Sequence, residues 1–95
     1  MNPTLFKQMT RRVSDIVSED LGDEVVLYDS KGNSIHVLNS TAKIIWELCD
    51  GDHTLEDMEN AIRSSFSGLE KHDVAKDILQ VINIFKEKAL LVVPT

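Results

Sequence analysis

The spacing of apolar residues changes near residue 39, and this change constrains the fold more than any other feature of the sequence. Before that point, apolar and polar residues alternate in short runs, as on strands with one buried face. After it, apolar residues recur every three or four positions, as on helices with one buried face. Prolines occur only at positions 3 and 94, so none interrupts either half. The sequence therefore predicts an α+β fold, a small antiparallel sheet followed by helices.

Three strands are predicted in the first half of the chain. The β-rich run 24–29 lies between two clusters of Gly, Asp, Ser and Asn, and the run 34–38 follows the second cluster. Residues 24–38 should therefore form a β-hairpin. A further strand is predicted around 13–19, where the alternation is looser.

Three helices are predicted in the second half. The first begins after Asn39, a good N-cap, and should end where Gly51 suits a left-handed C-cap. The second begins at Thr54, with Asp57 three residues later as an approximate capping box. The expected helices span 40–49, 54–66 and 70–88, and a short strand or extended tail follows at 90–93.

One block of the sequence resembles the signature of the PqqD family. Residues 38–54 read LNSTAKIIWELCDGDHT, and the family has a strand ending in Leu-Asn, then Thr-Ala, Ile-Trp, Asp-Gly and Thr. The run 77–79 resembles the family's Asp-Val-Leu, and the likeness extends over roughly 12–93. Two departures occur: 32–36 read GNSIH in place of an aromatic or Gly-Arg-Tyr lead-in, and 89–91 begin with Ala in place of Gly.

The resemblance implies a single winged helix-turn-helix domain at 12–93, preceded by an N-terminal arm at 1–11. It also implies a non-catalytic role without cofactor or metal. PqqD-like proteins bind the leader of a ribosomally made precursor peptide and present it to a modifying enzyme, often a radical-SAM enzyme. The leader adds to the third strand as an extra antiparallel strand and packs against the third helix. The expected peptide-binding residues are Ile35, His36, Val37 and Leu38 on the strand, and Val74, Asp77, Ile78 and Val81 on the helix.

A peptide groove is also supported by the residues themselves. If 34–38 is an edge strand, an extended peptide can complete its unpaired backbone groups, and its two faces should carry Ile35 with Val37 and His36 with Leu38. The apolar positions of the third helix span roughly 220°, whereas a core-facing stripe needs only about 100°.

The flank of the third helix with Val81 and Ile84, interrupted by Asp77, is the part of this arc that could line the groove. Alternatively, the extra arc packs under the N-terminal arm or in a homodimer. A monomer or a weak homodimer is expected.

Charge argues against nucleic acid as the partner. The chain carries a net charge of −6, and its pI is near 4.9. Phosphate contacts from Lys and Arg supply most non-specific affinity for DNA, yet the lysines of the third helix are balanced by carboxylates. A general protein-interaction module remains the second reading, and a winged-helix DNA-binding protein the third.

The sequence contains no motif for catalysis or metal binding. His36, His53, His72 and Cys49 match no zinc spacing, and Cys49 should be a small buried hydrophobe. Trp46 should pack in the core. A lone cysteine excludes an internal disulfide, and no signal peptide or apolar run of about 20 residues is present, so a cytoplasmic location is expected.

Overall fold

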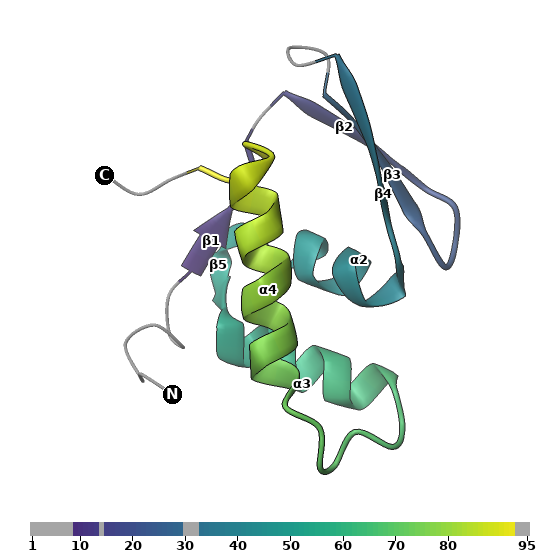
Figure 1. The fold of residues 1–95 in the computed structure, drawn as a ribbon, viewed down its shortest axis with the longest axis vertical. Coiled ribbons are helices and arrows are strands. Elements are labelled where there is room, and N and C mark those ends of the chain that lie inside the picture. The colour runs from purple at the N-terminus through teal and green to yellow at the C-terminus, as the bar shows by residue number, and fades with distance from the viewer. Residues whose placement is uncertain (1–8, 14, 30–32, 93–95) are drawn as a thin grey trace.

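The larger of two small sheets shares one core with the helices in the computed structural model, which describes residues 9–13, 15–29 and 33–92 (Figure 1). In chain order the elements are β1 Met9–Arg11, β2 Ile16–Asp20, β3 Val25–Asp29, β4 Ser34–Leu38, α2 Ser40–Glu47, β5 Asp50–Thr54, α3 Leu55–Ser65 and α4 Val74–Glu87. The predicted α+β class and the predicted order, a three-stranded antiparallel sheet before three helices, are confirmed.

The larger sheet has the strand order β2-β3-β4 and is antiparallel throughout. The predicted hairpin is confirmed, with Val25 opposite Leu38 at one end and Asp29 opposite Ser34 at the other. Leu38 is buried on the helix-facing side of the sheet, and Leu27 on β3 is fully buried beside it. The first strand of this sheet, β2, begins at Ile16, later than the predicted residue 13.

The smaller sheet corrects one prediction. The sequence predicted that residues 50–52 end a helix, but Asp50–Thr54 form β5, which pairs with β1. Gly51 does adopt a positive φ of 84°, as predicted, although within a strand. The prediction was wrong because the run has no apolar alternation, so only its partner β1, far away in the sequence, reveals it as a strand.

Side chains cap the start of each helix. The Asn39 side chain accepts a hydrogen bond from the backbone N–H of Ala42 at 2.9 Å. The predicted capping box is confirmed, because Thr54 Oγ1 accepts from the Asp57 N–H at 3.1 Å and Asp57 Oδ2 accepts from the Thr54 N–H at 2.8 Å. Asp73 caps α4 by accepting from the backbone N–H of Lys76, which explains why this helix begins later than the predicted residue 70.

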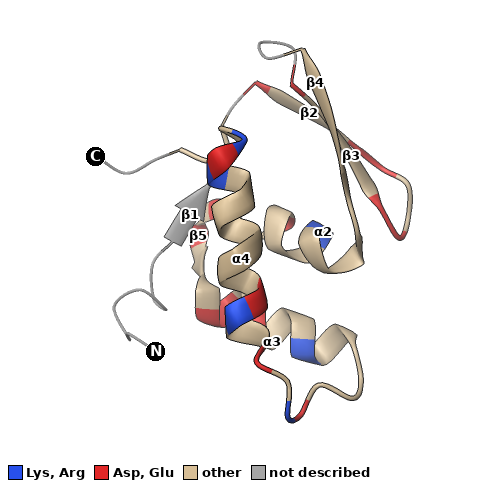
Figure 2. Cartoon of the chain, in the orientation of Figure 1, with Lys and Arg blue, Asp and Glu red and all other residues tan. Residues whose placement is uncertain are grey.

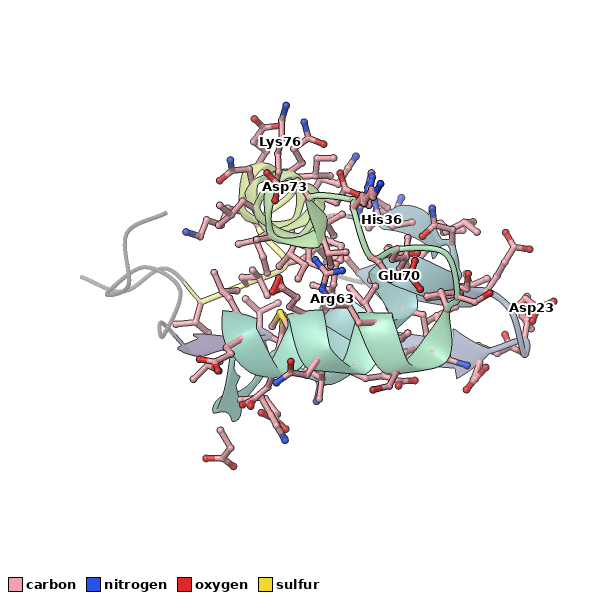
Figure 3. The ribbon with its side chains drawn as sticks, turned by 90° about the horizontal axis from the view of Figure 1, so that it is seen from below. Asp23, His36, Arg63, Glu70, Asp73 and Lys76 are labelled. Atoms are coloured by element: carbon pink, nitrogen blue, oxygen red, sulfur yellow. The ribbon has the colours of Figure 1, made fainter. Side chains whose placement is uncertain are left out.

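Arg63 fixes the connection between α3 and α4. Its guanidinium donates to the carbonyl oxygens of Leu69 at 2.6 Å and His72 at 3.1 Å. In Figure 3 the Arg63 side chain points from α3 towards the connecting loop that carries Glu70. The loop is thereby held beside the first turn of α4.

The core joins α2 to α4 through an aromatic pair. The rings of Trp46 and Phe85 meet edge to face, with their centroids 5.6 Å apart. Cys49 is fully buried close to them in the same cluster, so the predicted core positions of Trp46 and Cys49 are confirmed. Ile45, Met58, Ile78 and Leu90 are also buried in this cluster.

Arg12 connects the beginning and the end of the chain. Its guanidinium lies 5.6 Å from the Trp46 ring centroid and donates to the Trp46 carbonyl oxygen at 2.9 Å. Its backbone pairs with Leu91 in an isolated antiparallel bridge, so the predicted strand or tail at 90–93 is extended and partly paired. Val93, which belonged to that prediction, lies outside the described residues.

Candidate functional site

Strand β4 has a free edge that faces α4. It is the last strand of the sheet, and no other strand in the described part of the chain pairs with its outer side. In Figure 1, α2 is seen between α4 and β4, and α4 and β4 run in opposite directions. A free edge presents backbone N–H and C=O groups that an extended peptide can complete.

A cavity of about 280 Å³ opens between β4 and the C-terminal half of α4. Phe85 and Leu90 are buried there, while Ile84 is 46% exposed. The residues lining this cavity are Ile35, His36, Val37, Leu38, Ile84, Phe85, Lys88 and Leu90. It is therefore apolar, with one cation among its lining residues.

A second cavity, of about 270 Å³, lies at the other end of α4. It is lined by Thr41, Ile62, Phe66, Leu69, His72, Val74 and Asp77. Thr41 follows shortly after β4, so this cavity adjoins the end of the strand. Its polar rim contains an ion pair in which His72 Nε2 lies 2.5 Å from Asp77 Oδ2.

The two cavities are connected by one stripe of α4. Asp77, Val81, Ile84 and Lys88 are spaced i, i+4, i+7 and i+11, which places them on the same side of a helix. Asp77 lines the second cavity, while Ile84 and Lys88 line the first. Together, the free edge of β4, the two cavities and this stripe form what we call the β4–α4 groove.

The four predicted strand residues do not all face the same way. Ile35 and Val37 are 65% and 60% exposed on the outer face of the sheet. His36 is half-buried on the inner face, with Nε2 3.3 Å from Ser34 Oγ, and Leu38 is buried. The alternation predicted from the sequence is confirmed.

The four predicted helix residues separate into two pairs. Val74 and Ile78 are 2% and 0% exposed and belong to the core, and Val74 also lines the second cavity. They lie on the central line of the buried face, and their expected contact with a bound peptide stays a prediction. Val81 is partly buried against the core, and Asp77 lies at the rim of the second cavity.

Lys88 was not expected to line a groove, and Ile84 was named only as part of a flank. The signal that could have found them is the i, i+4, i+7, i+11 spacing from Asp77. Charged residues at the ends of a helix are usually solvated, so the sequence alone does not distinguish Lys88 from an ordinary surface lysine.

The shifted pKa values occur away from the groove. The hydrogen bond between the His53 ring and the Asp50 carboxylate raises the pKa of His53 above 6.5 and lowers that of Asp50 below 3.8. A hydrogen bond at 2.9 Å between Lys43 Nζ and Asp20 Oδ1 lowers the pKa of Asp20 and raises that of Lys43. The Lys43–Asp20 pair joins α2 to the end of β2, whereas the His53–Asp50 pair lies within β5.

The described residues include no group of three or more His, Cys, Asp or Glu side chains placed to hold a metal ion. No helix within 9–13, 15–29 and 33–92 has the length and apolar character needed to cross a bilayer.

Residues 24–91 match the family described as coenzyme PQQ synthesis protein D, PqqD. The chain belongs to the PqqD family. This match includes β3, β4, all three described helices and both walls of the β4–α4 groove. None of the curated proteins matches the chain.

Two solved structures share the PqqD-like fold of this chain. TbiB1 in complex with the TbiA(β) leader peptide is 24% identical and has a TM-score of 0.77, covering 90% of this chain and 98% of TbiB1. Lasso peptide synthetase B1 complexed with the leader peptide is 25% identical and has a TM-score of 0.74, covering 90% of this chain and 100% of that protein. In both structures a protein of this fold holds a leader peptide.

Proposed function

We propose that this PqqD-family chain binds the leader of a ribosomally synthesised precursor peptide by taking it up as an additional strand beside β4. The observation that carries the proposal is the free edge of β4, which opens onto an apolar groove against α4. The family match and the shared fold with two leader-peptide complexes support the same function.

The leader would run antiparallel to β4 and present alternate side chains to the two faces of the sheet. Side chains on the inner face would contact α4 around Ile84 and Val81. Side chains on the outer face would lie beside Ile35 and Val37, which are both exposed. A short added strand buries a small interface, below about 1,200 Å² in total, so micromolar affinity is the rough expectation.

In this function the chain is a binding domain and not a catalyst. It holds the leader while a separate enzyme modifies the rest of the precursor peptide, in PQQ biosynthesis or another peptide-modification pathway, and a radical-SAM enzyme is one candidate. We place this activity in the cytoplasm, in a domain spanning 12–93 that acts as a monomer or weak homodimer, with residues 1–11 as its N-terminal arm. Neither a cofactor nor nucleic acid takes part.

An NMR titration of ¹⁵N-labelled protein with synthetic leader peptides encoded beside its gene tests the function. Peptide capture predicts shifts concentrated at 34–38 and along the groove side of α4. The variant Ile84→Asp should weaken binding at least tenfold, because it places a carboxylate in the apolar part of the groove. Asn83→Asp adds the same charge at an exposed neighbouring position and should change binding less than twofold.

The same titration separates the two alternative functions. A duplex DNA control that shifts the spectrum while no leader does would support a winged-helix DNA-binding protein. Shifts caused only by a purified modifying enzyme would support a general interaction module. Either result would contradict the proposed function.

A further inference from the structure

We propose that the β4–α4 groove selects leaders by charge order, with a cationic side chain near the N-terminal end of the bound strand and an anionic one near its C-terminal end. The inference rests on the proposed function and names the class of leader that the groove accepts. It follows from where the groove places its own charges.

The charges of the groove stripe lie at its two ends. Asp77 and Lys88 are its terminal members, and the apolar side chains of Val81 and Ile84 lie between them. Figure 2 shows that the middle turns of α4 carry no Lys, Arg, Asp or Glu, whereas both ends carry charges of both signs, of which only Asp77 and Lys88 belong to the stripe. A bound strand therefore meets an anion at one end, apolar surface in the middle and a cation at the other end.

The two end residues differ in what already contacts them. At the first end, Asp77 Oδ2 is bonded to His72, and a carboxylate has room to accept further donors. At the second end, Lys88 lines the apolar cavity beside Ile35, where an ammonium group is available to a peptide carboxylate. The net charge of −6 would favour a cationic peptide overall. Attraction of an anionic side chain must therefore come from Lys88 in the groove and not from the overall charge of the protein.

The direction of the bound strand converts this pattern into a charge order. The leader runs antiparallel to β4, and β4 and α4 run in opposite directions, so the leader runs parallel to α4 (Figure 1). Its N-terminal end therefore lies near Asp77, and its C-terminal end lies near Lys88.

The length of the stripe sets the spacing. Asp77 and Lys88 are eleven residues apart on a helix, which is about 16 Å at a rise of 1.5 Å per residue. A strand covers this distance in about five residues at 3.3 Å each. Only residues an even number apart share a face of a strand, so the cationic and anionic side chains should be four or six positions apart.

A selection from displayed peptides of about twelve random residues tests the charge order without a known ligand. We expect the wild-type protein to enrich peptides in which Lys or Arg precedes Asp or Glu by four or six positions. With Lys88→Glu, the enriched peptides should carry Lys or Arg in place of Asp or Glu near their C-terminal end. Lys86→Glu makes the same change in net charge on another side of α4 and should leave the preference as in wild type.

Synthetic copies of one enriched peptide give the magnitude. Replacing its anionic residue by Lys should weaken binding to wild-type protein about fivefold at low salt, as expected for an exposed ion pair, and the difference should shrink at 0.5 M salt. Lys88→Glu should reverse the preference.

Each other outcome is decisive. Enriched peptides that show no charge order, or the same order with Lys88→Glu, overturn the inference and leave the proposed function in place. If wild-type protein enriches no peptide beyond the Ile84→Asp background, the proposed function fails, and the charge order fails with it.

Discussion

At the scale of single residues, Ala89 adopts a backbone conformation that its side chain disfavours. It has a φ of 58° and follows Lys88, the C-cap of α4. The N–H of Leu90 donates to the Phe85 carbonyl at 2.9 Å and that of Ala89 to the Lys86 carbonyl at 3.0 Å, which is the Schellman arrangement. This position is the one where the PqqD pattern has Gly.

Ala89→Gly should therefore stabilise the protein. Relief of the left-handed strain gains about 1–2 kcal/mol, and the greater freedom of Gly in the unfolded chain removes about half of that. We expect a net gain of about 0.5–1 kcal/mol in the free energy of unfolding, measured by urea denaturation. Glu87→Gly, inside the last turn of α4, is the control and should lower stability by about 1 kcal/mol. A loss of stability in Ala89→Gly would contradict the prediction.

A second prediction at this scale concerns pH and the His53–Asp50 pair. Because the folded pKa of His53 is raised, the contribution of this residue to the free energy of unfolding is complete below pH 6.5. It is lost as the pH rises through the folded pKa. Because the folded pKa of Asp50 is lowered, its contribution to the free energy of unfolding is present above pH 3.8. It is lost as the pH falls through the folded pKa. The stability difference between wild type and Asp50→Asn should therefore be greatest between about 3.8 and 6.5.

An NMR titration of the imidazole measures this directly. The pKa of His53 should lie above 6.5 in wild type and return towards 6.5 in Asp50→Asn. An unchanged His53 pKa in the variant would show that Asp50 does not shift it.

At the scale of elements, the caps decide where each helix begins. α3 starts at Leu55 because Thr54 and Asp57 satisfy each other's backbone N–H groups. α4 starts at Val74 because Asp73 accepts from the first turn, although the apolar pattern alone allowed an earlier start. Capping residues can be found in a sequence, but several candidates near residue 70 compete, and the packing of the loop on Arg63 selects one.

Thr54→Ala should destabilise the protein through α3. It removes the hydroxyl that accepts from the Asp57 N–H, which typically costs about 1 kcal/mol. Thermal unfolding followed by circular dichroism measures the effect, and the midpoint should fall by about 4–8 °C. Ser65→Ala, at the exposed end of the same helix, is the control and should change the midpoint little. Equal effects of the two variants would contradict the role of the capping box.

At the scale of the whole molecule, the core and the groove share one side chain. Phe85 packs edge to face on Trp46 and also lines the cavity beside β4. The position of the groove wall relative to the sheet therefore depends on core packing between α2 and α4.

Phe85→Leu should consequently affect both stability and binding. Loss of the aromatic contact and imperfect repacking should cost about 1–2 kcal/mol, visible in urea unfolding monitored by Trp46 fluorescence. Leader binding should also weaken, although the side chain is buried. Ile84→Asp should weaken binding with less effect on stability, because Ile84 is nearly half exposed. If Phe85→Leu bound the leader as tightly as wild type does, the shape of the groove would not depend on core packing.

The sequence alone determined the type of most elements, because periodicity, caps and turn residues are local. The hairpin at 24–38, the α3 capping box and the alternation along β4 could all be predicted. Only the tertiary structure revealed β5, because its polar residues become a strand through pairing with the distant β1. The tertiary structure also decided which flank of α4 is open. An apolar arc in the sequence does not show which part of it the neighbouring elements cover. The burial of Val74 and Ile78 and the exposure of Ile84 depend on where the sheet and α2 pack.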